Sequence, residues 1–329
     1  MQSCHWSLAR RLNGSIPCVF TTTLVVLSLC VSSTTTAGTL KLYWSDIFDT
    51  VITRSNLDGT QAEAITRTPG GVVPNIAFDP VNQRVYWPSP VAEGIQSANY
   101  DGSDVETVIT GIATPTVVAV DAVNRKAYWV DYDAYSSIWR GNLDGTDREK
   151  LASDIPPPRD IQVDPIDGYY YVVGLFGEIY RTSFDGTHTD STFFPRSPRQ
   201  IAIDPIDGYV YATDSSYQAI IRMNLDFSDP TLWVTQGVSN PEGIVVDTTN
   251  GRVIWSNEGL SAVAGSTNIS SINFAGSDQR IDFYPLWYEY AAALVEHLGI
   301  VEVSTPEPSA LCLCSLAGIM PFLFRRVRG

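Results

Sequence analysis

The stretch KAYWVDYDAYSSIWRGNLDG, residues 126–145, carries two markers that recur along the chain. The first is a Tyr-Trp pair or a variant of it, and its six copies start at residues 43, 86, 128, 171, 211 and 254. The second is an Asp-Gly turn or its variant, which in the first five copies follows about fifteen residues later. An aspartate also stands seven residues before each of the last five starts. A period near 42 residues is typical of a propeller blade or a comparable repeat.

Each repeat consists of short apolar runs separated by turn residues. In the third repeat these runs are Thr116–Asp121, Lys126–Val130 and Ile138–Leu143, followed by a weaker run at Glu149–Leu151. The Asp144-Gly145 pair between the last two suits a tight hairpin, because both residues tolerate a positive φ. No helical periodicity competes between residues 39 and 282. The sequence therefore predicts an all-β, six-bladed β-propeller with four-stranded antiparallel blades over residues 38–303.

Ring closure needs a strand from the far end of the chain. The first repeat starts at its second strand, near Tyr43, so it lacks an innermost strand of its own. We expect the segment Ala291–Val303 to supply that strand by pairing beside Leu40–Trp44.

The markers resemble a known repeat. Tyr-Trp-Ser-Asp at 43–46, Tyr-Trp-Val-Asp at 128–131 and Tyr-Ala-Thr-Asp at 211–214 are similar to the low-density lipoprotein receptor class B (YWTD) repeat. Ile-x-Arg-x-x-Leu-Asp-Gly at 52–59 and 138–145 agrees with it. The resemblance implies a six-bladed propeller that binds other proteins and has no catalytic apparatus. Repeats two, four and six depart from the motif at 87–89, 172–174 and 256–257.

Acidic and basic residues vary together among the repeats. Where the motif ends in Asp, an Arg follows eight or nine residues later; where Ser89 or Asn257 replaces the Asp, the later residue is Ser97 or Ser271. Repeat four is an exception, since Arg181 is kept opposite Gly174. We predict structural ion pairs on neighbouring strands. The predicted pairs are Asp46 with Arg54, Asp131 with Arg140, and Asp214 with Arg222.

Two tails flank the repeats. Residues 1–37 combine Arg10 and Arg11, a short apolar run and a small-residue exit near Ala37, the features of a secretory signal peptide. Residues 304–329 contain Pro306-Glu307-Pro308, an apolar run at 310–324 that is short for a membrane span, and a basic end. The basic residues of this end are Arg325, Arg326 and Arg328.

The C-terminal tail resembles a PEP-CTERM sorting signal. That resemblance implies recognition by an exosortase-type membrane protease, transient membrane anchoring through the tail, and delivery to the cell surface or extracellular matrix of a polysaccharide-producing bacterium. The alternative is a simple C-terminal membrane anchor that is retained.

Composition limits the chemistry of the repeat region. All five cysteines lie in the two tails, so neither disulfides nor thiol chemistry are expected in the propeller. Without the tails, 16 basic and 35 acidic residues remain, a net charge of −19. This charge argues against nucleic acid as a partner. His5, His188 and His297 show no metal-binding spacing. We expect no cofactor; Ca²⁺ is a candidate at most, with Asp131-Tyr132-Asp133 the nearest approach to a calcium loop.

Candidate ligand-binding residues fall in loops that a propeller brings to one face. We call this the top face: the loops between second and third strands, and the loops that join one blade to the next. Exposed aromatics with interspersed charges can form binding hot spots, although each could equally be an ordinary solvated loop residue. The candidates in the loops within blades are Phe48, Asp49, Tyr132, Asp133, Tyr135, Phe176 and Tyr217. Those expected around the channel mouth are Asn75, Arg159, Asp160, Arg199, Gln200 and Glu242.

Three functions remain open at this point. The first is an exported, non-enzymatic propeller that binds a surface protein or polysaccharide. The second is a propeller enzyme of lactonase or lyase type with a metal in the channel, which would need Asp, Glu or Asn side chains converging there. The third is an architectural matrix protein, which would lack a concave aromatic patch on the top face.

Overall fold

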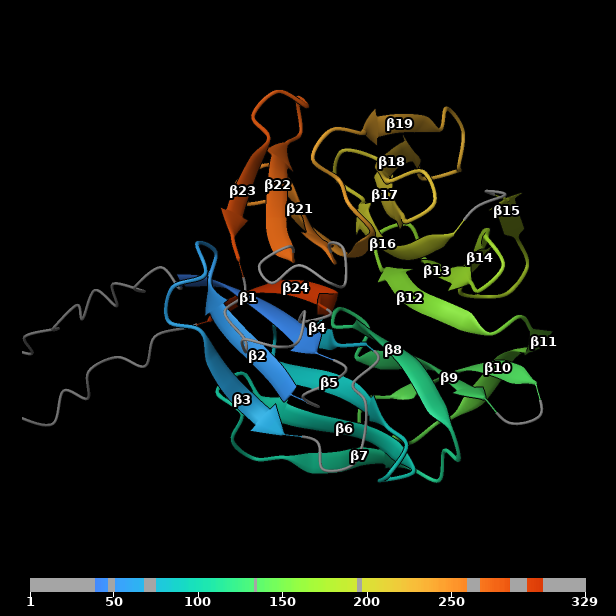
Figure 1. Ribbon diagram of the computed structural model, residues 1–329. Coiled ribbons are helices and arrows are strands. Elements are labelled where there is room, and N and C mark those ends of the chain that lie inside the picture. Colours follow the sequence, from blue (N-terminus) through green and yellow to red (C-terminus); the bar gives the residue numbers. More distant parts are fainter. Residues whose placement is uncertain are drawn as a thin grey trace, which may run out of the picture. The chain divides into compact units, whose positions relative to one another are not determined.

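The computed structural model describes residues 39–46, 51–67, 75–132, 135–193, 197–258, 267–284 and 295–303; for Asp46 and residues 295–303 the description covers the backbone. These residues form six four-stranded antiparallel sheets, the blades of a β-propeller (Figure 1).

The strands are given from the channel outward. Blades one and two consist of β24 (Val295–Val303), β1 (Thr39–Asp46), β2 (Val51–Asn56) and β3 (Glu63–Arg67), then β4 (Ala77–Asp79), β5 (Arg84–Ser89), β6 (Gly94–Asn99) and β7 (Glu106–Thr110). Blades three and four consist of β8 (Pro115–Asp121), β9 (Lys126–Tyr132), β10 (Ser136–Asn142) and β11 (Glu149–Ile155), then β12 (Pro158–Asp164), β13 (Tyr169–Gly174), β14 (Glu178–Ser183) and β15 (Thr189–Phe193). Blades five and six consist of β16 (Pro198–Asp204), β17 (Tyr209–Asp214), β18 (Ala219–Asn224) and β19 (Thr231–Val234), then β20 (Pro241–Asp247), β21 (Arg252–Asn257), β22 (Asn268–Asn273) and β23 (Arg280–Phe283).

The ring closes as the sequence predicts. Inner strands contact one another in the order β4, β8, β12, β16, β20 and β24, and β24 in turn contacts β4. Strand β24 pairs antiparallel with β1, so that Thr39 lies opposite Val303 and Trp44 opposite Leu298. Figure 1 shows the inner strands around the centre, with outer strands such as β7 and β15 at the periphery. The C-terminal segment thus completes the blade that the N-terminal segment begins.

The hydrophobic core lies between blades. Each of six buried clusters contains residues of two neighbouring sheets. The Tyr-Trp pair explains this arrangement, because adjacent residues of a strand point to opposite faces. Tyr43 is buried against blade two and Trp44 against blade six. Tyr128 and Trp129 repeat this, facing blades four and two. Each buried aromatic ring contributes on the order of 2–3 kcal/mol relative to an exposed one.

An arginine on the third strand links neighbouring blades. Arg140 lies opposite Tyr128 in the ladder and is therefore on the same face as that ring. Its guanidinium group donates to the backbone carbonyl of Phe184 in blade four at 3.0 Å and forms an ion pair with Glu149 on β11. Arg54 does the same in blade one, donating to the carbonyl of Tyr100. Its ion-pair partner is an outer-strand acid as well, Glu63.

The predicted Asp–Arg pairs are therefore wrong where the structure describes both side chains. In the strand ladder Arg140 lies opposite Tyr128, which is three residues before Asp131 on the same strand. Because side chains alternate along a strand, those of Arg140 and Asp131 point to opposite faces of the blade. The Asp131 carboxylate instead accepts the backbone N–H of Thr114. The same offset separates Arg222 from Asp214, whose carboxylate accepts the N–H groups of two turn residues. In the third predicted pair, the side chain of Asp46 lies outside the described residues.

Blades two and six obtain an equivalent arginine from another position. Their third strands carry Ser97 and Ser271, which cannot form an ion pair. Arg84 and Arg252, at the start of the second strand, donate to these serine hydroxyls. Each also bonds an outer acid: Arg84 pairs with Asp104 at 2.7 Å, as Arg252 does with Asp278 at 2.8 Å. When serine replaces the third-strand arginine, an arginine of the second strand thus supplies a guanidinium group to the same face of the blade.

Both tails lie outside the described residues, and so do the predicted sorting residues Pro306, Glu307, Pro308, Arg325, Arg326 and Arg328. The domain limits at residues 37 and 304 stay predictions. In the part of the chain that is described, no helix is long and apolar enough to cross a membrane.

We expect Arg140→Ala to lower the free energy of unfolding by about 2–3 kcal/mol, because the partly buried Phe184 carbonyl loses a charged donor. Glu149→Ala, which removes the half-exposed ion-pair partner, should cost about 0.5 kcal/mol. Urea denaturation of both variants measures the difference. Equal losses would mean that the ion pair, rather than the inter-blade hydrogen bond, stabilises the contact.

Candidate functional site: the channel mouth and top face

The described side chains that line the channel are apolar with one exception. The inner strands surround a cavity of about 220 Å³, lined by residues of β4, β8, β12, β16 and β20 and of the segments that lead into them. Gln162 is the one polar side chain among the described lining residues. The converging acids that a channel enzyme would need are absent from that lining, and the described residues include no cluster of three metal-ligating side chains.

Three of the predicted site residues join blades together. Asn75, Asp160 and Gln200 occupy the same register position, at or just before the inner strand of their blades, and all three are buried. Each side-chain oxygen accepts a backbone N–H from the next blade. Asn75 accepts the N–H of Val118 at 2.8 Å, and Gln200 that of Ile244 at 2.6 Å. These side chains thus join blade two to three, blade four to five and blade five to six at the channel mouth.

Asp160 is the central member of this set. Its carboxylate accepts the N–H of Ile201 at 3.1 Å and also contacts the side-chain amides of Gln162 and Asn75. Burial raises the pKa of this carboxyl to about 7, although these donors act in the opposite direction. The hydrogen-bond donors are neutral amides, so they offset only part of the cost of burying the charge.

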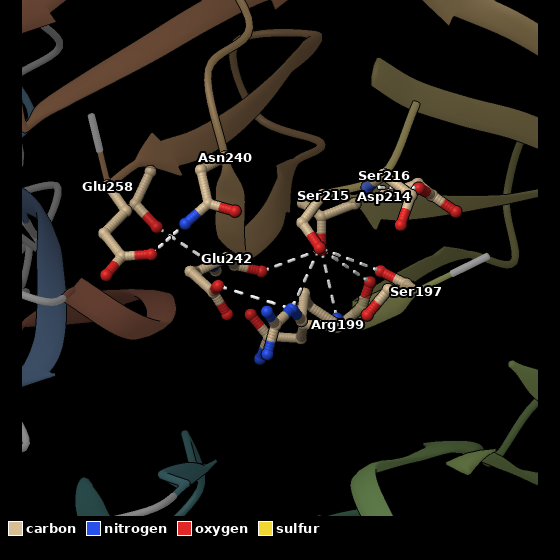
Figure 2. Close-up of polar contacts among 12 residues, drawn as sticks. Ser197, Arg199, Asp214, Ser215, Ser216, Asn240, Glu242 and Glu258 are labelled. Atoms are coloured by element: carbon tan, nitrogen blue, oxygen red, sulfur yellow. Dashed lines mark hydrogen bonds and ion pairs between the residues drawn. The ribbon is translucent and has the colours of Figure 1, made fainter. Parts of the chain in front are cut away.

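A charged cluster lies at the mouth between blades five and six (Figure 2). Arg199, the residue before Gln200, donates to the hydroxyl of Ser215 at 3.2 Å and lies 3.4 Å from the Glu242 carboxylate. Glu258 extends the cluster by accepting the side-chain amide of Asn240. Figure 2 shows these groups converging from separate blades. The cluster is half-buried, since 29% of the Arg199 side chain and 13% of the Glu242 side chain remain exposed.

The charge state of Glu242 is sensitive to pH near neutrality. Burial raises its pKa to about 7; Arg199 and Arg159 lower it, and Glu258 raises it. An ion pair at 3.4 Å would by itself keep the carboxyl ionised, but desolvation outweighs it at this depth. Burial also raises the pKa of Glu258. A carboxyl that titrates near pH 7 beside a guanidinium group can exchange a proton or bind a polar ligand.

Aromatic side chains are also exposed on the top face. The exposed fractions are 42% for Tyr132, 68% for Tyr135, 66% for Phe176 and 39% for Tyr217. They follow the second strands of blades three, four and five. Turn geometry holds one of them in place, because Asp214 accepts the N–H of Tyr217 at 2.8 Å.

The predicted site residues thus fall into three groups. Asn75, Asp160 and Gln200 lie inside the ring, whereas Arg159, Arg199, Glu242 and the four exposed aromatics lie at or near the surface. Phe48, Asp49 and Asp133 lie outside the described residues, and the candidate calcium site at 131–133 stays a prediction with them. Sequence reasoning placed Glu258 on the top face only as the start of a loop insertion in the sixth repeat, residues 258–268, and it did not single out Asn240. The two residues come from different connections of blade six. Nothing in their local sequence indicates that these two residues meet.

No protein-family model matches the chain. A stretch of 54 residues is 41% identical to nidogen of Drosophila melanogaster; this match spans 16% of the chain and only 4% of nidogen's length. Among solved structures, a chain of a nidogen–laminin complex superposes with a TM-score of 0.66 at 19% identity, covering 81% of this chain and 100% of that one. A Bacteroides caccae protein of unknown function gives 0.59 at 14% identity, covering 80% and 99%. A gluconolactonase of Xanthomonas campestris gives 0.53 at 15%, covering 68% and 77%. At these identities the superpositions show the propeller fold alone.

Asn75→Ala is expected to lower the free energy of unfolding by about 1–3 kcal/mol, since it leaves the buried N–H of Val118 without an acceptor. Asn82→Ala, at an exposed turn of the same blade, should change it by less than about 0.5 kcal/mol. Thermal unfolding of the two variants tests the structural role. If Asn75→Ala proves neutral, the bond between blades two and three does not stabilise the ring.

Glu242 should make the protein less stable as the pH rises. Its pKa is higher in the folded chain than its ordinary value of 4.5, so its contribution is greatest below pH 4.5 and is lost as the pH rises to about 7. Glu242→Gln should remove this dependence and raise stability at pH 8 by on the order of 2–3 kcal/mol. Denaturation at pH 4.5 and pH 8 is the measurement. A native-minus-variant difference that does not change with pH would contradict the raised pKa.

Proposed function

We propose that this chain is an exported, non-enzymatic β-propeller that binds a protein or polysaccharide partner at the cell surface or in the extracellular matrix. The carrying observation is the top face, which exposes Tyr132, Tyr135, Phe176 and Tyr217 and also carries a half-buried Arg–Glu cluster. Aromatic side chains and arginine are residue types that dominate binding energy at interfaces.

Two further observations support binding over transport or catalysis within the channel. Gln162 is the one polar side chain of the described channel lining, and that lining contains no carboxylate that could act on a substrate. A chain of a nidogen–laminin complex has a similar propeller fold, which supports a fold of this kind as a platform for a protein partner.

The cellular address in this proposal comes from the tails. The predicted signal peptide at 1–37 directs export, and the tail at 304–329 is a substrate for an exosortase-type protease. The net charge of −19 between them suits a soluble disc outside the cell and disfavours nucleic acid.

An enzymatic alternative has one observation in its favour. Glu242, with a pKa raised to about 7, is partly buried beside Arg199, as a general acid or base can be. The gluconolactonase superposition adds the fold and nothing finer. Lactone hydrolysis that Glu242→Gln abolishes while the variant stays folded would favour this alternative over partner binding.

We expect the double variant Tyr135→Ala with Phe176→Ala to lose capture of the partner by at least about tenfold, because two exposed rings leave the interface. Immobilised protein is exposed to cell-surface extract with and without glycosidase treatment, and the retained material is quantified. The matched control is Leu232→Ala, which removes a 51% exposed side chain from the outer strand β19. Equal capture by all three proteins would reject the top face and favour an architectural role.

A further inference from the structure

The turns between first and second strands carry exposed aliphatic side chains at one repeated position. Val81, Val123, Ile166 and Ile206 each stand two residues after the last residue of the inner strand in blades two to five. Their exposed fractions lie between 66% and 75%. We call these four residues the aliphatic rim. Because all inner strands run in the same direction, the rim surrounds the channel at the end opposite the top face.

Buried carboxylates hold these side chains outward. Asp79 accepts the N–H of Val81 at 3.0 Å, and Asp164 and Asp204 accept those of Ile166 and Ile206 at 2.9 and 3.1 Å. The three aspartates themselves are fully buried. The turns are therefore shaped by the fold, and the aliphatic groups cannot collapse onto the blade to avoid water. A repeated exposed apolar position of this kind indicates a contact surface.

The chain leaves the propeller at the same rim. Gly299 lies opposite Tyr43 in blade one, as Ala77 lies opposite Tyr86 in blade two. Val303 is four residues after Gly299, and Val81 is four residues after Ala77. Val303 therefore has the same position in blade one that Val81 has in blade two. The C-terminal tail therefore starts within the ring of turns that carries the aliphatic rim.

The linker between the propeller and the apolar segment of the tail is short. Six residues, 304–309, separate Val303 from the apolar segment 310–324, and six extended residues span at most about 20 Å. An apolar segment that starts so close to the rim brings the rim to any bilayer that it enters. Basic residues at 325, 326 and 328 end the chain beyond it.

We propose that the aliphatic rim rests on a lipid bilayer when segment 310–324 is inserted, with its four side chains in the interfacial region. Removing exposed Val and Ile side chains from water favours this contact. Exposed Asp167 and Asp207 stand beside two of the rim residues, so uncharged lipid surfaces are preferred to anionic ones. The top face then points away from the membrane. This orientation is independent of which partner the top face binds.

The test uses the full chain with its five cysteines replaced by alanine and a single labelled cysteine. An environment-sensitive fluorophore is placed by Ile166→Cys in the rim or by Tyr135→Cys on the top face, and each protein is reconstituted into phosphatidylcholine vesicles. We expect emission from position 166 to shift to shorter wavelength and to be quenched by a quencher carried on the lipids. Emission from position 135 should stay that of a solvated probe.

A second variant distinguishes contact through the rim from attachment through the C-terminal tail. Val81→Asp, Val123→Asp and Ile206→Asp are added to the chain labelled at position 166, and circular dichroism checks that it folds. We expect the lipid quenching to be lost although the tail still holds the protein on the vesicle. Three outcomes would overturn the proposal: a solvated probe at 166 in the parent chain, unchanged quenching in the aspartate chain, or equal quenching at 135.

The oligomeric state in detergent tests the alternative that a second copy of the chain, instead of a bilayer, contacts the rim. If light scattering shows a dimer that the three aspartates dissociate, the rim is a contact between two copies of the chain, and the membrane proposal fails. A monomer that is quenched more on anionic than on phosphatidylcholine vesicles would also contradict contact through apolar side chains.

Discussion

Burial between neighbouring sheets is the constraint on which this structure depends. A four-stranded blade has two apolar faces, and neither can be covered except by another blade. The Tyr-Trp pair divides that task, since Tyr43 covers one neighbour and Trp44 the other. Because every interface needs both partners, an open row of blades would leave two apolar faces in water. Pairing of β24 with β1 removes those faces and thereby stabilises the ring.

Polar groups stabilise the same interfaces between blades at three distances from the channel. Near the channel mouth, Asn75, Asp160 and Gln200 accept N–H groups of the next blade. Further out, Arg54 and Arg140 donate to carbonyls of the next blade. Outer acids then pair with those arginines in partly solvated positions, where ion pairs contribute little. Buried acceptors and donors are costly to leave unpaired, so the inner two layers specify the blade order more strongly than the outer one.

The proposed binding surface is largely separate from this framework. The groups that hold the blades together face neighbouring sheets, whereas Tyr135, Phe176 and Tyr217 are exposed in connections between second and third strands. Such loops can vary without loss of the fold. The two ends of the channel also differ: one carries aromatic rings and charges, and the other carries aliphatic tips and the exit of the C-terminal tail. A disc of this kind can be oriented on one side and bind on the other.

The sequence by itself determined the blade number, the strand order within a blade and the need for a closing strand, because these follow from local periodicity and turn chemistry. Only the tertiary structure decided which groups meet. Strand alternation with the observed register puts Arg140 beside Tyr128 and Glu149 rather than Asp131, and a spacing of nine residues cannot reveal that register. Arg199 lies in β16 of blade five, whereas Glu242 in β20 and Glu258 after β21 belong to blade six, so their proximity and the raised pKa of Glu242 depend on ring packing. Asn75 and Gln200 look like loop residues in sequence, but burial turns them into inter-blade acceptors.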